Sequence, residues 1–267
     1  MRIKFNGQEV ETYCETTTDF FKSKSQDISD IWIVNGFATK EMIRLQENDE
    51  LFCISKNVLP PEEALDAMMR SRHTPLVHQR LKTSKIAICG LGGLGSHIAI
   101  MLARSGVGKL ILIDFDSVDA SNLNRQSYRV NDLGRLKTEA LRDQIREINP
   151  FILIEIYTLR ITDQNLEELF VGCDIVCEAF DNVESKKLLM QNFHFYFEHI
   201  PLICASGMAG YGDSNSIQTH RIAKNLYICG DLKNQAQVGR GLMAPRVTLC
   251  AAHQANLALE LLMQKEK

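Results

Sequence analysis

A glycine-rich turn in this chain is followed by charged residues of the kind that handle phosphate groups. An apolar run ends at Cys89 and meets glycines in G-x-G-x-x-G spacing, after which apolar residues recur at helical period. The pattern predicts a strand that enters a helix through a tight turn. Such a turn lets a phosphate approach the backbone, and the helix N-terminus offers free N–H groups. The glycines are Gly90, Gly92, Gly93 and Gly95.

An acidic residue follows the next predicted strand. Residues 110–113 form an apolar run that ends at Asp114, about 20 residues after the turn, where nucleotide-binding folds place an acid on the ribose. A tight turn without any ligand is the alternative interpretation, but Asp114 at this distance favours a nucleotide. Up to this point an NAD site fits as well as an ATP site.

Two cations further along the chain favour ATP chemistry over hydride transfer. Arg125 lies in S-N-L-N-R-Q, and Lys137 ends G-R-L-K just before a strongly helical segment. When a carboxylate attacks the α-phosphorus of ATP, two anions meet and charge builds on the phosphate oxygens, so fixed cations and a metal ion stabilise the transition state. Each cation alone would be an ordinary surface charge, but their placement after two nucleotide-fold strands favours a function.

The order of these motifs resembles the ThiF/MoeB/HesA family, the bacterial relatives of ubiquitin-activating enzymes. Those enzymes adenylate the C-terminal glycine of a small β-grasp carrier protein. Their motifs are similar to G-x-G-G-L-G, then D-x-D with S-N-L-x-R-Q, then a lysine that opens a helix, then D-N. Each occurs here in order, the last as Asp181-Asn182. The resemblance extends from Arg70 to about Met263.

The resemblance implies a role for each of these residues. Asp114 would bind the ribose hydroxyls, and Asp181 would hold Mg²⁺ on the triphosphate. The phosphate contacts would come from Asn122, Arg125 and Lys137. No general base is required, because the carrier carboxylate is already ionised near neutral pH. The expected ATP-binding residues are Gly90, Gly92, Gly93, Gly95, Asp114, Asn122, Arg125, Lys137, Asp181 and Asn182.

Arg72 is the fourth residue expected to act in catalysis, beside Arg125, Lys137 and Asp181. It lies in R-S-R-H, where members of the family carry an arginine that reaches the ATP site of the partner subunit. This role would require a homodimer. A surface arginine at the end of a helix is the alternative interpretation.

The cysteine pattern departs from the family. Many members carry two C-x-x-C pairs that bind zinc, whereas the eight cysteines of this chain form none, so zinc is not expected. Only Cys229 remains where the first pair should lie, and the following K-N-Q-A-Q-V-G-R-G lacks the reactive cysteine of sulfur-handling members. Cys204 and Cys229 are weak candidates for sulfur chemistry, and buried structural thiols are the expectation for most of the others.

The N-terminal residues resemble a ThiS-type β-grasp sulfur carrier. Alternating residues predict short strands at 1–5, 31–34 and 51–55, a helix at 16–21, and a hairpin turn at Asn35-Gly36. Family carriers end in Gly-Gly, but here the chain continues through S-K-N-V-L-P-P. With no free carboxylate to adenylate, we expect a role in docking, dimerisation, regulation or solubility. An unrelated accessory domain is the alternative.

Together these patterns predict an α/β protein with two domains. A ThiS-like β-grasp domain without the Gly-Gly tail occupies residues 1–57, and a linker with a helix occupies 58–84. A Rossmann-like, mainly parallel sheet with flanking helices occupies residues 85–267. The strand at 175–177 would deliver Asp181 to the carboxyl edge of that sheet, where ligands bind. Glycine-rich residues 206–216 and 239–246 are expected to cover the adenylate or the carrier tail, with ordinary flexible turns as the alternative.

Composition excludes several classes of protein. The 267 residues are 45% hydrophobic, enough for one large core and a small accessory domain. A net charge of −3 argues against nucleic acid as a partner. No apolar run reaches the roughly 20 residues of a membrane span, and the N-terminus lacks an apolar signal segment. We therefore expect a cytoplasmic protein.

The sequence thus predicts an ATP- and Mg²⁺-dependent adenylyltransferase that acts on a separate ThiS-like sulfur carrier, with thiamine biosynthesis as the expected pathway. Three alternatives remain open. A related enzyme would activate a small carboxylate or a tRNA base. An NAD-dependent oxidoreductase would leave Arg125, Lys137 and Asp181 unexplained. A non-catalytic scaffold would bind carriers without releasing pyrophosphate.

Overall fold

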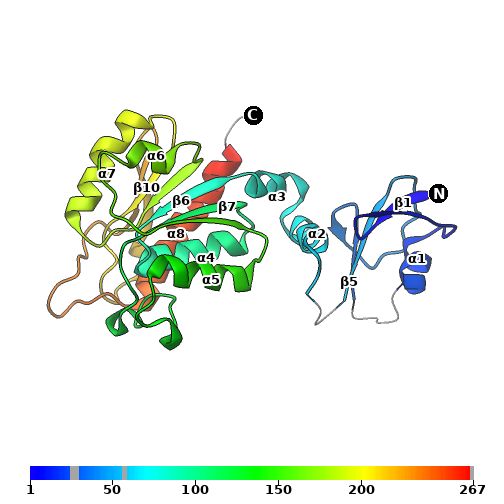
Figure 1. The fold of residues 1–267 in the computed structure, drawn as a ribbon, viewed down its shortest axis with the longest axis horizontal. Helices are drawn as coiled ribbons and strands as arrows, with labels where there is room; N and C mark the ends of the chain where they lie inside the picture. The colour runs from blue at the N-terminus through cyan, green and yellow to red at the C-terminus, as the bar shows by residue number, and fades with distance from the viewer. Residues whose placement is uncertain (25–29, 56–58, 265–267) are drawn as a thin grey trace. The chain divides into compact units, whose positions relative to one another are not determined.

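The computed structural model describes residues 1–24, 30–55 and 59–264 (Figure 1). The chain forms two compact units, Met1–Arg80 and Leu81–Lys267. The point where the small domain departs from a Gly-Gly ending, at residues 56–58, lies outside the described residues. The expected linker at 58–84 is divided between the units, and its first helix belongs to the smaller one.

The first unit contains a five-stranded sheet in the order β2-β1-β5-β3-β4. The outer pairs are antiparallel, whereas β1 and β5 at the centre are parallel, as expected of a β-grasp sheet. The predicted hairpin turn is confirmed: Asn35 and Gly36 both have positive φ, at 49° and 83°. The strands are β1 (Arg2–Phe5), β2 (Gln8–Glu11), β3 (Ile31–Val34), β4 (Phe37–Ala38) and β5 (Glu50–Ile54).

Both faces of this small sheet are covered. Neighbouring residues in a strand point to opposite faces, so Leu51 and Phe52 enter different clusters. Helix α1 (Thr17–Lys24) packs Phe20 and Phe21 on the first face. Helix α2 (Glu62–His73) packs Ala64 and Ala67 on the second.

The second unit is built on a seven-stranded sheet in the order β11-β12-β10-β9-β6-β7-β8. Every neighbouring pair is parallel except β11 and β12, which confirms the Rossmann-like fold class. The terminal hairpin of β11 and β12 is absent from the sequence-based expectation. The strands are β6 (Lys85–Cys89), β7 (Lys109–Ile113), β8 (Leu153–Tyr157), β9 (Ile175–Glu178), β10 (Leu202–Ala205), β11 (Gln218–Ala223) and β12 (Leu226–Gly230).

Helices cover both faces of the large sheet, as Figure 1 shows. Helices α6 and α7 pack Phe170 and Phe193 against one face. Helix α4 contacts both α5 and α8 on the other. The helices are α3 (Pro75–Lys82), α4 (Gly93–Arg104), α5 (Lys137–Ile148), α6 (Leu166–Phe170), α7 (Val183–Tyr196) and α8 (Ala244–Gln264), with 3-10 turns at Ala120–Asn122, Val130–Asp132 and Ser214–Ser216. None of the helices in the described ranges combines the length and apolar character of a membrane span.

The strand order reverses at β6, and this reversal places the site. From β6 the chain proceeds to β7 and β8 on one side, whereas β9 and β10 lie on the other. The helices that follow β6 and β9 therefore diverge above the carboxyl ends of these strands. Open α/β sheets bind ligands in the crevice formed at such a point.

Candidate functional site

A cavity of about 810 Å³ lies at the carboxyl ends of the central strands of the second unit. Its volume falls within the roughly 300–1,000 Å³ of small-molecule sites. The structure brings the expected ATP-binding residues together there, with Gly95 as the exception. The lining includes Gly90, Gly92, Gly93, Asp114, Asn122, Arg125, Lys137, Asp181 and Asn182.

The glycines of the turn have different tasks. Gly90 has a φ of 88°, and a Cβ on it would lie 2.8 Å from the carbonyl oxygen of Ala179. A Cβ on Gly95 would lie 1.8 Å from the carbonyl oxygen of Gly90, so Gly95 packs the helix against the turn and does not line the cavity. Around Gly92 the nearest atom, Nε2 of Gln126, would be 3.7 Å away. Gly92 therefore leaves the backbone open to a ligand at the N-terminus of α4.

Asp114 follows β7 and holds the glycine turn in place. Its carboxylate accepts hydrogen bonds from the backbone N–H of Leu91 at 2.6 Å and of Asp116 at 2.8 Å. Burial raises its pKa, and the charge of Lys137 acts in the opposite direction. Asp114, the residue expected to bind the ribose, thus also holds the glycine turn against the end of β7. The spacing of the sequence did not predict this second role.

Lys137 is the first residue of α5, and its side chain is 8% exposed. Its Nζ lies 3.0 Å from Oδ2 of Asp116 and 3.9 Å from Oδ2 of Asp114. Asp116 lines the cavity but was not among the expected site residues, although the D-x-D spacing in the sequence pointed to it. Ion pairs with the two carboxylates therefore hold the Lys137 ammonium group at the wall of the cavity.

Arg125 lines the cavity from a loop whose backbone carbonyls accept hydrogen bonds from side chains. Its guanidinium donates hydrogen bonds to the Ser121 carbonyl at 3.1 Å and to Oδ1 of Asn124 at 2.8 Å. Nε2 of His97 on α4 donates to the Arg125 carbonyl at 3.1 Å. Burial lowers the pKa of His97, which favours the neutral ring. Asn122 supports the same loop, because its side chain accepts from the N–H of Asp119 at 3.2 Å.

Asp181 and Asn182 lie between β9 and α7. Asn182 caps α7 by accepting from the N–H of Ser185 at 2.7 Å, while the exposed Asp181 lines the cavity. The described ranges contain no cluster of three or more His, Cys, Asp or Glu side chains that could hold a metal ion. Mg²⁺ accepts one carboxylate together with phosphate oxygens and water, so Asp181 fits an ion brought by a triphosphate.

One part of the cavity lining offers flat and aliphatic surfaces that suit a planar base. The guanidinium of Arg160 lies 4.0 Å from the centre of the Phe115 ring. Both residues line the cavity beside the aliphatic Leu159 and Ile161. Stacked and aliphatic surfaces at one end, with cations beyond them, can hold a nucleotide.

An ion pair that sequence reasoning missed supports the floor of the site. Glu178 is fully buried, and burial raises its pKa, although Lys186 counteracts this effect. Nζ of Lys186 lies 3.1 Å from Oε2 of Glu178 and donates to the Ala205 carbonyl at 2.6 Å. An acid within an apolar strand was the only signal in the sequence.

Replacing Lys186 with methionine should therefore destabilise the second unit in a pH-dependent way. Without the lysine, the pKa of Glu178 rises further above its unfolded value. A raised pKa contributes stability at low pH that is lost as the pH rises through the folded value. We expect a loss of about 2 kcal/mol at pH 8 and a smaller loss at pH 5. Thermal unfolding at both pH values measures this, with Lys187→Met as the exposed control. Equal losses at the two pH values would refute this role of Lys186.

The remaining candidates lie elsewhere. Arg72 is exposed on α2 in the first unit, whereas the cavity belongs to the second. Cys204 and Cys229 are buried, and burial raises the pKa of both thiols, that of Cys229 to about 11. Thiols whose pKa is raised in this way are largely protonated near neutral pH and are poor nucleophiles.

Comparison with known proteins gives consistent matches. Residues 66–267 match the ThiF family, and residues 1–57 match the family described as ThiS-like ubiquitin. The molybdopterin-synthase adenylyltransferase of Salmonella typhimurium is 34% identical over 190 residues, which cover 69% of this chain and 75% of that protein. Ubiquitin-like modifier-activating enzyme 5 of Caenorhabditis briggsae is 37% identical over 120 residues, 41% of this chain. The probable adenylyltransferase/sulfurtransferase MoeZ of Mycobacterium tuberculosis is 34% identical over 142 residues, 53% of this chain.

The matched regions span only 28% of the length of the Caenorhabditis enzyme and 34% of that of MoeZ. Among solved structures, the Escherichia coli tRNA N6-threonylcarbamoyladenosine dehydratase in complex with ATP is similar at a TM-score of 0.68 and 25% identity. This match covers 77% of the present chain and 97% of that one. PaaA is similar at a TM-score of 0.54 and 27% identity, over 84% of this chain and 71% of its own. Because the family match covers most of the chain, this protein belongs to the ThiF family.

Proposed function

We propose that this protein is an ATP-dependent adenylyltransferase that activates the C-terminal glycine carboxylate of a separate ThiS-like sulfur carrier. The observation that carries this proposal is the cavity at the sheet edge. It combines the glycine turn and Asp114 with the two cations Arg125 and Lys137 and the open carboxylate of Asp181. We propose that the protein acts in thiamine biosynthesis and that it is located in the cytoplasm.

In this mechanism the protein binds and orients charge. The base would occupy the end near Phe115, the ribose would meet Asp114, and the phosphates would lie at the N-terminus of α4. The carrier carboxylate attacks the α-phosphorus, an O–P bond forms, and the bond to the β-phosphate breaks to release pyrophosphate. Arg125 and Lys137 would stabilise the charge that develops on the phosphate oxygens. Mg²⁺, held with the triphosphate by Asp181, would neutralise part of the same charge.

A tRNA base is the second candidate acceptor. The Haemophilus influenzae tRNA threonylcarbamoyladenosine dehydratase is 35% identical over 156 residues, and a solved enzyme of that name contains ATP. Two observations favour the carrier instead. The net charge of −3 offers no general attraction to RNA, and the chain already contains a ThiS-like domain.

Carrier-dependent ATP–pyrophosphate exchange tests the function. The purified protein would be offered ThiS-like carriers that end in Gly-Gly, and each carrier without these two residues would be the matched control. Exchange that requires the intact tail would support adenylation and identify the partner. Exchange with tRNA alone would favour the second candidate. Enhanced NADH fluorescence on mixing would favour an oxidoreductase, and ATP binding without exchange would favour a scaffold.

We also propose that Arg72 acts across a homodimer interface. In a mixture of Arg72→Ala and Lys137→Ala protomers, each mixed dimer would then contain one intact site. The mixture should regain about one quarter of wild-type exchange, because half of the dimers are mixed and half of their sites are complete. The same mixture would stay inactive if Arg72 served its own subunit. Sedimentation would establish that the protomers associate and exchange.

A further inference from the structure

Two loops in the second unit form one wall of the cavity. They follow β10 and β12 and are joined by backbone hydrogen bonds. The N–H of Asp231 donates to the Gly207 carbonyl at 2.8 Å, and that of Leu232 to the Ser206 carbonyl at 3.1 Å. Further along, the N–H of Ala209 donates to the Asn234 carbonyl at 3.0 Å. The paired loops therefore behave as one piece of structure.

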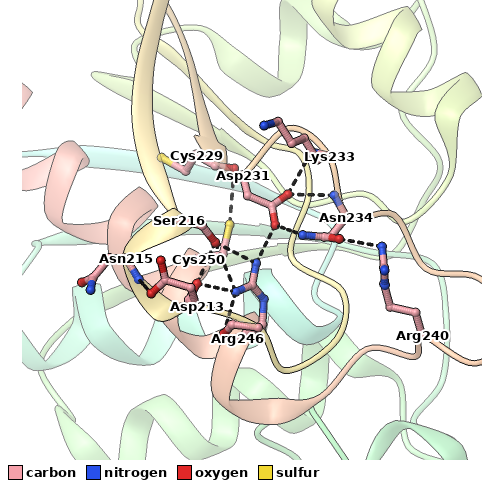
Figure 2. A network of polar contacts seen from close by, with 11 residues as sticks. Asp213, Asn215, Ser216, Cys229, Asp231, Lys233, Asn234, Arg240, Arg246 and Cys250 are labelled. Atoms are coloured by element: carbon pink, nitrogen blue, oxygen red, sulfur yellow. Dashed lines mark hydrogen bonds and ion pairs between the residues drawn. The ribbon is translucent and has the colours of Figure 1, made fainter.

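A buried ion pair anchors this wall. NH2 of Arg246 lies 2.6 Å from Oδ2 of Asp231, and each side chain is only 4% exposed. NH1 of Arg246 also donates to the carbonyls of Gly212 at 3.1 Å and Asp213 at 2.8 Å. Figure 2 shows the guanidinium between these segments. Arg246 lies near the start of α8, so the predicted crossover segment 239–246 ends inside a helix, and the rigid helix fixes the arginine.

Asp231 also binds the loop that follows it through hydrogen bonds. Its Oδ1 accepts from the N–H of Lys233 at 2.9 Å and of Asn234 at 2.8 Å, and its other oxygen accepts from the Asn234 side chain. Oδ1 of Asn234 then accepts from NH1 of Arg240 at 2.6 Å (Figure 2). The ion pair thus sets the conformation of the loop from Asp231 to Arg240.

The residues of these two loops that line the cavity are uncharged, because Lys233 and Arg240 are not part of the lining. They are Ser206, Gly207, Met208, Asn234, Gln235 and Ala236. The cations lie on other segments, at Arg125, Lys137, Arg160 and Lys186. This part of the lining supplies no counter-charge for phosphates, but its backbone and amide groups can exchange hydrogen bonds with an extended peptide. The part of the lining with cations therefore suits the nucleotide, and the uncharged part suits a peptide.

We propose that Asp231 and Arg246 are positioning residues for the acceptor. They hold the wall against which the extended tail of the carrier lies while its carboxylate meets the nucleotide. This assignment rests on the proposed function, since it takes the acceptor to be a polypeptide tail.

Two conservative variants test the assignment in the exchange assay. Arg246→Lys keeps the charge but loses the planar fork, and Asp231→Asn keeps the shape but loses the charge. In both we expect KM for the carrier to rise about tenfold, the loss of one or two good hydrogen bonds. The Kd for ATP should stay within about twofold of the wild type. A purely structural role would instead reduce the folded fraction, which lowers apparent kcat and leaves KM unchanged.

A milder variant and a control complete the experiment. Asn234→Ala keeps the buried ion pair and removes the side-chain links of residue 234 to Asp231 and to Arg240. It therefore reports on the wall even if the ion-pair variants fold poorly, and KM should again rise. Arg221→Ala is the matched control, because Arg221 is exposed and donates to carbonyls within its own hairpin. If the wild type exchanges pyrophosphate with a carrier but Asn234→Ala leaves KM unchanged, the inference alone is overturned. If the wild type exchanges with no carrier, the proposed function fails and the inference fails with it.

Discussion

Replacement of either Arg125 or Lys137 by alanine should lower the turnover of carrier-dependent exchange by about 100-fold or more. This corresponds to about 3 kcal/mol of transition-state stabilisation, comparable with the loss of one preorganised donor at a developing charge. The measurement is kcat at saturating ATP and carrier.

The two substitutions should differ in a second readout. Lys137 is nearly buried beside Asp114 and Asp116, whereas Arg125 donates to an exposed loop. Loss of Lys137 removes the charge that counteracts the raised pKa of Asp114. Lys137→Ala should therefore weaken ATP binding as well as turnover. Arg129→Ala is the control, because Arg129 pairs with Glu147 on the surface. An unchanged kcat in either variant would remove that residue from the mechanism.

Replacement of Gly95 by alanine should be among the most damaging single changes in the second unit. The new Cβ would overlap the backbone of Gly90, at 1.8 Å from its carbonyl oxygen, and neither strand β6 nor helix α4 can retreat without losing core contacts. We expect a loss of at least about 3 kcal/mol, beyond ordinary overpacking. The corresponding fall in Tm is roughly 6–12 °C.

Gly92→Ala provides the matched comparison three residues away. A Cβ there has room, with its nearest neighbour 3.7 Å away, so Tm should stay within about 3 °C of the wild type. The methyl group would nevertheless stand where a phosphate approaches the helix N-terminus. ATP affinity should therefore fall while the fold is kept. A Gly95→Ala protein with wild-type Tm would mean that the turn can open without cost.

Local patterns were enough to predict most of the architecture. The alternation that predicts strands, the Asn35-Gly36 turn and the glycine turn at Gly90 all act within a few residues, and the structure confirms these elements. The helical segment predicted beside Lys137 is confirmed as α5, which begins at Lys137 and ends at Ile148. The prediction for the small domain was less complete. No local pattern in α2 indicates that Ala64 and Ala67 cover the second face of the small sheet.

The sequence by itself determined which residues gather at the cavity, because the carboxyl ends of parallel strands meet at one edge and carry whatever follows them. Asp114, Arg125 and Asp181 come together for this reason. Only the tertiary structure decided which charges pair. Lys137 with Asp116, Glu178 with Lys186, and Asp231 with Arg246 lie 8 to 21 residues apart along the chain. Their meeting depends on how strands and helices stack, and local periodicity does not record that information.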